Sequence, residues 1–272
     1  MTATRIPWIT SRNPVTVRGA VPGPLRHLDL LGAGVLTALL ALAPIAGWGT
    51  PGDNPALGVG VGGAVAVLAT VMLLRRGGTA ELVGLPALAG AAWALRFAPS
   101  VSAFAPYLFL PALAGYLRGP RVGFIAGITA AAAAGTIEPG SWVVFQLIGA
   151  GWMGTTAGVA AQVAGRRGGL RGRISLAAAC LTGGYVYGVF LNATVWTGVW
   201  AGAAASLWGA EVPMPLGLAH FIQFYVATAL PWDTVRGLGL AAMAIGLPWP
   251  LLLRVGCLHR QRVTGARSAA PA

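Results

Sequence analysis

Residues 119–158 constrain the fold of this chain more than any other stretch. They form two apolar runs separated by a short polar turn, EPGS, at 138–141. Arg118 and Arg121 stand at the start of the first run, and another arginine pair follows the second run at 166–167. Long apolar runs that are joined by a polar turn and bounded by cations predict a helical hairpin that crosses a membrane and returns.

Small residues recur in the second arm of this hairpin, at Gly154 and Gly158. A spacing of four residues places both glycines on one face of a helix, where another helix can approach backbone to backbone. The first arm begins with a distinctive tripeptide, Gly119-Pro120-Arg121. We therefore expect the second arm to pack closely against a neighbouring helix.

The rest of the chain repeats this pattern, and its composition excludes a soluble protein. Of the 272 residues, 56% are hydrophobic and only 9% are charged, whereas a soluble domain has about a quarter charged residues. The formal net charge is +12, and the basic residues are arginines in short clusters between apolar runs. This placement carries topology information and argues against a nucleic-acid-binding patch.

The predicted fold is an all-α integral membrane protein with about eight transmembrane helices. A spanning helix needs about 20 mainly apolar residues, and the candidate segments are 28–48, 56–74, 80–98, 102–118, 121–137, 142–165, 174–196 and about 234–256. We expect 215–231 to be interfacial or re-entrant on the outer side, with an interruption at 231–233. Because the arginine clusters alternate with segments that lack basic residues, the positive-inside rule places both termini in the cytoplasm.

Polar and aromatic residues gather in the outer halves of the later helices and form a candidate substrate-binding site. These residues are Trp142, Gln146, Trp152, Tyr187, Asn192 and Trp196. An aromatic belt at the membrane surface is the alternative explanation for each tryptophan. For the two amides the alternative is hydrogen bonding between helices.

Three ionisable residues depart from the topological pattern, namely Arg96, Asp233 and Arg236. Asp233 and Arg236 are three residues apart, so an ion pair on one helical face is within reach. Such a pair would lower the cost of placing both groups near the hydrocarbon. The arginines either extend to the outer headgroups or have a structural or ligand-facing role.

The sequence does not predict an enzyme. It contains neither a phosphate-binding P-loop nor a G-x-S-x-G nucleophile motif, and its acidic residues are scattered. The histidines and cysteines have no metal-ligand spacing, so no metal or cofactor is expected. If the protein drives uptake, ATP hydrolysis belongs to partner subunits.

Three segments resemble the substrate-binding S components of energy-coupling factor (ECF) transporters, a class of ABC importers. They are the run GYLRGPRVGF…W…FQL…GAGWMGTTAG within 115–158, the segment FYVATALPWDTVR at 224–236, and AAWALRF at 91–97. The resemblance implies a six-helix core and a location in the cytoplasmic membrane of a prokaryote. It also implies capture of a vitamin-like small molecule outside and its delivery inside, with a transmembrane coupling subunit and two ABC ATPases as partners.

The resemblance divides the chain into four parts: a cytoplasmic tail (1–27), two N-terminal transmembrane helices (28–78), the binding core (79–256) and a basic cytoplasmic tail (257–272). In S components, an Ala-x-x-x-Ala face on the first core helix contacts the coupling subunit. Ala87 and Ala91 are the matching pair here, with packing inside the bundle as the alternative.

The chain departs from the family pattern at two places, which leaves the ligand open. The outer turn reads EPGSW at 138–142, and LGL at 238–240 stands where the last helix usually has an asparagine. The alternative functions are a self-sufficient secondary transporter, for which an internal repeat is expected, and a non-catalytic membrane scaffold.

Overall fold

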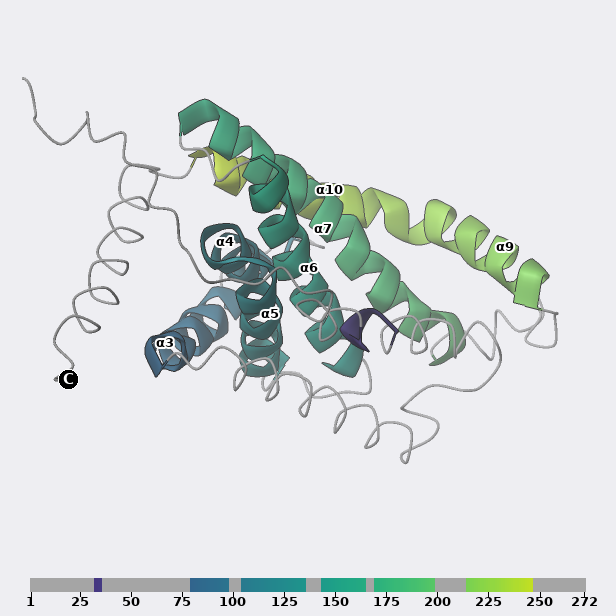
Figure 1. The fold of residues 1–272 in the computed structure, drawn as a ribbon. Coiled ribbons are helices and arrows are strands. Elements are labelled where there is room, and N and C mark those ends of the chain that lie inside the picture. The colour runs from purple at the N-terminus through teal and green to yellow at the C-terminus, as the bar shows by residue number, and fades with distance from the viewer. Residues whose placement is uncertain are drawn as a thin grey trace, which may run out of the picture.

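The structure is a computed structural model that describes residues 32–35, 79–97, 104–135, 143–164, 169–198 and 214–246, and the regular elements in these ranges are all helical (Figure 1). The seven α-helices are α3 (Thr79–Arg96), α4 (Phe109–Arg118), α5 (Pro120–Gly135), α6 (Val143–Val163), α7 (Gly169–Gly198), α9 (Met214–Phe224) and α10 (Leu230–Gly246). A 3₁₀ turn, η3 (Pro106–Leu108), precedes α4, and a π turn, η4 (Tyr225–Ala229), joins α9 to α10. Except for 32–35, the two predicted N-terminal transmembrane helices lie outside the described residues, as do both tails and the turn at 138–141.

Two of the described helices, over Val143–Val163 and Leu170–Asn192, are long and apolar enough to cross a membrane. The predicted span 102–118 is shorter in the structure, with 10 residues in α4 preceded by the three-residue turn η3. Pro106 opens that turn, and proline favours the first position of a helix because its missing N–H has no partner there. The helical stretch therefore begins at Pro106.

A single residue, Gly119, connects α4 to α5. Its φ angle is 105°, a conformation that glycine adopts readily and residues with a Cβ rarely do. Its N–H donates to the carbonyl of Gly115 at 2.7 Å, and Pro120 then starts α5. The distinctive tripeptide at 119–121 is thus a one-residue helix-to-helix turn, with glycine after one helix and proline at the start of the next.

Glycines bring α4, α5 and α6 together. A Cβ added to Gly115 of α4 or Gly123 of α5 would overlap the carbonyl oxygen of Gly154 in α6. A Cβ added to Gly158, one turn further along α6, would overlap the backbone of Pro120. The predicted close approach at Gly154 and Gly158 is confirmed, and it draws in two neighbouring helices.

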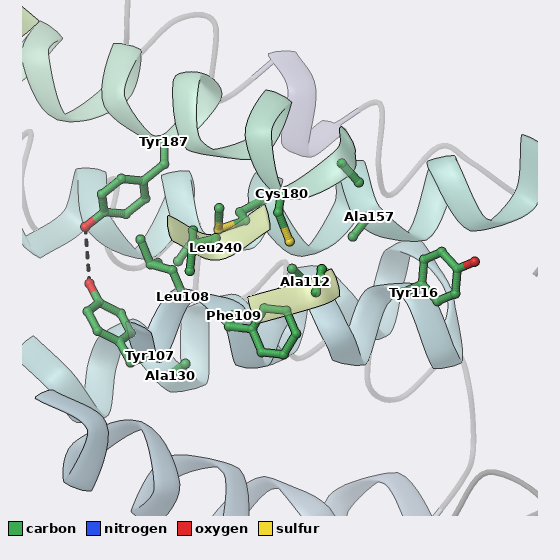
Figure 2. Packing of buried hydrophobic residues seen from close by; sticks show 14 of the residues in the cluster. Tyr107, Leu108, Phe109, Ala112, Tyr116, Ala130, Ala157, Cys180, Tyr187 and Leu240 are labelled. Carbon is green, nitrogen blue, oxygen red and sulfur yellow. Dashed lines mark hydrogen bonds between the residues drawn. The ribbon is translucent and has the colours of Figure 1, made fainter. Parts of the chain in front are cut away.

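The core to which α4, α6, α7 and α10 contribute combines many alanines with larger aliphatic and aromatic side chains (Figure 2). Ala112, Ala157, Cys180 and Leu240, one from each of these helices, are fully buried in it. Small side chains allow the backbones to come close, so dispersion contacts between whole helices stabilise the bundle.

The predicted interruption at 231–233 is wrong, because the chain stays helical from α9 through η4 into α10. In the π turn, the N–H of Leu230 donates to the carbonyl of Tyr225, one residue further back than in an α-helix. Pro231 follows at once, where an ordinary helix would set its ring against a carbonyl of the preceding turn. The wider turn shifts these carbonyls and lets the helix continue.

The exposure pattern of α10 is the reverse of that of a helix at a water interface. Asp233 and Arg236 are buried, at 1% and 8% exposure, whereas Trp232, Val235 and Leu238 are exposed. A surface helix of a soluble protein turns its apolar stripe inward and its charges outward. Here the charged pair faces the bundle, together with Leu240, while Trp232, Val235 and Leu238 face away from it.

Candidate functional site

Ionisable and hydroxyl groups from four parts of the fold come together around Asp233 and Arg236. We call this group the tyrosine–arginine cluster; it comprises Arg96 at the end of α3, Tyr107 in η3, Tyr187 in α7, Tyr225 in η4, and Asp233 and Arg236 in α10. Two of the three ionisable residues that departed from the topological pattern, Asp233 and Arg236, are therefore in contact, and the third, Arg96, acts electrostatically on tyrosines of the cluster.

Asp233 is the centre of the cluster. Arg236 forms an ion pair with its Oδ1 atom, and the hydroxyl of Tyr225 donates to its Oδ2 atom at 2.8 Å. Both carboxylate oxygens therefore accept a hydrogen bond, which offsets part of the large cost of taking a charge out of water.

Gly188 of α7 provides the space for this carboxylate. A Cβ at position 188 would overlap the side chain of Asp233. One turn earlier, a Cβ at Gly184 would lie 2.9 Å from the Cα of Gly237 in α10. The two glycines, four residues apart, form a smooth face that sets the short distance between α7 and α10.

Arg236 also links the ion pair to two tyrosines. Its guanidinium carbon lies 5.1 Å from the centre of the Tyr187 ring, within range of a cation–π interaction. The hydroxyl of Tyr187 lies 3.2 Å from that of Tyr107, and Figure 2 shows the two hydroxyl groups pointing towards each other at one end of the core. Arg96 acts electrostatically on both hydroxyls, and η3 packs against both α3 and α10.

The predicted amides lie beside the cluster. Gln146 is half-buried and stands one turn before Gly149 on α6, where an added Cβ would lie 2.9 Å from the ring of Tyr187. Asn192 donates from Nδ2 to the carbonyl of Gly188 at 2.7 Å, so it occupies the next turn of α7. Both amides therefore lie about one helical turn beyond the cluster, Gln146 towards the start of α6 and Asn192 towards the end of α7.

Trp152 lies elsewhere, although the sequence places it with the other substrate-binding candidates. Its ring meets that of Phe124 edge-on, with centroids 5.8 Å apart, in a second cluster with Ala33 and Ile125. Near Tyr187, α6 contacts α7 through Gly149. This close contact leaves no room there for the indole ring of Trp152. Of the other predicted tryptophans, Trp142 lies outside the described residues, and the structure describes only the backbone of Trp196.

Comparison with models of protein families, with curated proteins and with solved structures found no match to this chain. The function must therefore be inferred from the geometry of its own residues.

The predicted docking pair, Ala87 and Ala91, is exposed along α3. Gly90 lies beside it, and among the described residues a Cβ added there would meet no atom within 4 Å. The buried side of the same helix is marked by Ala92, at 0% exposure. The small-residue face of α3 therefore points away from the other described helices.

The sequence did not point to Tyr107 or Gly188 as part of the site. The signal for Gly188 is present, because the G-x-x-x-G spacing at 184–188 repeats the one at 154–158 and encloses two tyrosines. One of them, Tyr185, lies with its hydroxyl 2.9 Å from Oγ1 of Thr234 in α10. Tyr107 follows a proline in a short turn, and no local pattern identifies it as part of the site.

Proposed function

We propose that this chain is the substrate-binding subunit of an ECF-type importer in the cytoplasmic membrane of a prokaryote, with both termini in the cytoplasm. The observation that carries the proposal is the tyrosine–arginine cluster, in which Tyr107, Tyr187, Asp233 and Arg236 are buried. Ionisable groups inside a membrane are costly, face the bundle interior and mark the paths of substrates or ions. The arginine distribution puts this cluster in the outer half of the bundle, where a subunit that captures its ligand outside needs its binding site.

Membrane placement is supported by three independent features. Two helices are long and apolar enough to span, and arginine clusters alternate along the chain in the manner of the positive-inside rule. On α10 the exposed residues are apolar while the ion pair is buried, which suits a surface in contact with lipid.

The ligand would lie on the outer side of the cluster, between Gln146 of α6 and Asn192 of α7. Small-molecule sites combine a few fixed polar groups with aromatic and apolar walls. The amides would fix the ligand's polar groups, and Trp142 and Trp196 would cover its apolar body. The cluster contains two arginines and one aspartate, so its excess positive charge favours a vitamin-like ligand with an anionic group.

Binding measurements on the purified chain test this site. A panel of vitamins is screened by the shift in melting temperature, and the dissociation constant of the strongest ligand is then measured. Gln146→Ala should weaken binding by roughly 10- to 100-fold, because one lost hydrogen bond costs about 0.5–1.5 kcal/mol and an unpaired buried group about 1–3 kcal/mol. Gln162→Ala changes the same residue type at an exposed position on α6 and should leave affinity unchanged; equal effects of the two variants would refute the assignment.

The open face of α3 supports docking to a coupling subunit that carries two ABC ATPases. Exchanging Ala87 and Ala91 for leucine adds volume where a partner helix would approach closely. The double variant should keep its ligand affinity and lose co-purification with the coupling subunit. Ala178→Leu, at an exposed position on α7, is the matched control, and normal co-purification of the double variant would move the docking surface elsewhere.

A second candidate function, a self-sufficient secondary transporter, is favoured by the linked ionisable groups of Tyr225, Asp233 and Arg236. Chains of such groups serve as proton relays in transporters. Liposomes that contain this chain alone separate the two functions. Uptake driven by an ion gradient would establish the secondary transporter, whereas the importer requires the coupling subunit, the ATPases and ATP. A non-catalytic scaffold would give no uptake in either system.

A further inference from the structure

An apolar groove lies between α3 and α4. It is on the face of α4 opposite to the one that packs against Gly154 of α6. Both helices pack on α5, but they make little contact with each other along their length, and they converge only where α3 meets η3. The space between them has a volume of about 250 Å³. The three helices lie together on one side of the bundle (Figure 1).

The lining of the groove is apolar except at one end. Leu85 and Leu88 of α3 face Leu113 and Leu117 of α4 across it, and Arg118 is the one charged residue among the described residues that line it. Arg118 is the last residue of α4, so the charge lies at the α4–α5 turn. That turn belongs to the arginine-rich side of the topology, which the proposed membrane placement assigns to the cytoplasm.

We propose that this groove binds an anionic phospholipid of the cytoplasmic leaflet, with one acyl chain between α3 and α4 and the phosphate group at Arg118. An apolar slot within a membrane protein is filled most favourably by a hydrocarbon chain, since neither water nor a polar ligand finds partners on its walls. A cation at the interface end of the slot complements a lipid phosphate, and the cytoplasmic leaflet is the anionic one. The inference rests on the proposed membrane placement and is independent of the transport reaction.

The test uses the full chain, purified in detergent and freed of lipid, with dioleoyl-phosphatidylglycerol and dioleoyl-phosphatidylcholine as probes. Native mass spectrometry measures the affinity for each lipid. Phosphatidylglycerol should bind more tightly, and Arg118→Gln should reduce this preference about fivefold, the equivalent of about 1 kcal/mol. Arg118→Lys should retain the preference. Arg171→Gln, which removes an exposed arginine at the start of α7, should not change it.

Two further measurements separate the lipid from a simple anion. Ala114→Phe places a ring in the groove and should weaken binding of both lipids, and its melting temperature in detergent reports whether the fold is retained. Glycerol 3-phosphate, which has the phosphate without acyl chains, should not displace phosphatidylglycerol. Equal affinity for the two lipids, equal effects of Arg118→Gln and Arg171→Gln, or displacement by glycerol 3-phosphate would each overturn the proposal. Because these assays need no partner subunit, their failure leaves the import function to be judged by uptake alone.

Discussion

Gly188 is the position where a single methyl group should disturb the candidate site most. In Gly188→Ala the new Cβ would overlap the carboxylate of Asp233, so that side chain would have to move away from both Arg236 and Tyr225. Overpacking of a well-packed core costs about 1–3 kcal/mol, and disruption of a buried ion pair costs about 3–5 kcal/mol. Alanine restores about 0.5–1 kcal/mol of helix propensity. The expected net loss of stability is therefore roughly 3–7 kcal/mol.

The assay is reversible unfolding of the purified protein in mixed detergent micelles, followed by tryptophan fluorescence. Gly90→Ala is the matched control, because a Cβ at that position of α3 meets no atom of the described residues within 4 Å. It should be neutral or slightly stabilising, by up to about 1 kcal/mol.

A double-mutant cycle identifies the clash. In an Asp233→Ala background the carboxylate is gone, so Gly188→Ala should cost little and could restore some stability through helix propensity. An interaction free energy of at least about 2 kcal/mol between the two sites is expected from the overpacking and ion-pair terms. If Gly188→Ala costs as much without Asp233 as with it, the space at Gly188 serves something other than this carboxylate, and the reasoning fails.

Three other experiments test the packing of the described helices and the predicted topology. Tyr225→Phe removes the bond to Asp233 and should lower stability by about 1.5–3 kcal/mol, whereas Tyr185→Phe removes a bond between neutral groups and should cost about 0.5–1.5 kcal/mol in the same unfolding assay; equal losses would contradict the ionic role of Asp233. Gly154→Ala should lower the melting temperature strongly, because its Cβ would overlap the backbone of α5, and a normal melting temperature would show that the helices can separate there without cost. Cys257 should react with a membrane-impermeant thiol reagent only after cell lysis, as the positive-inside rule requires, and labelling of intact cells would overturn the topology.

The sequence determined the helical class of this protein and much of its packing. Apolar runs placed α3, α5, α6 and α7 close to their actual bounds, because a helix that buries itself among other helices or in lipid needs a long apolar stretch. The spacing of Gly154 and Gly158 was sufficient to predict a close contact, since small residues four apart always share a face of a helix. The spacing of Asp233 and Arg236 likewise placed both groups within reach of each other.

Only the tertiary structure decided what surrounds that pair. Tyr107, Tyr187 and Tyr225 come from three separate elements, and which of them reach Asp233 or Arg236 depends on how α7 and α10 cross. That crossing is set by Gly184, which allows the close approach to Gly237, and by Gly188, whose missing side chain leaves space for the carboxylate. The helix through Pro231 was likewise hidden, because a local rule predicts that proline ends a helix, and the π turn that accommodates it has no signature in a single sequence. Trp152 shows the same limit: its position on α6 is clear from the sequence, but the neighbour it faces is a property of the packed bundle.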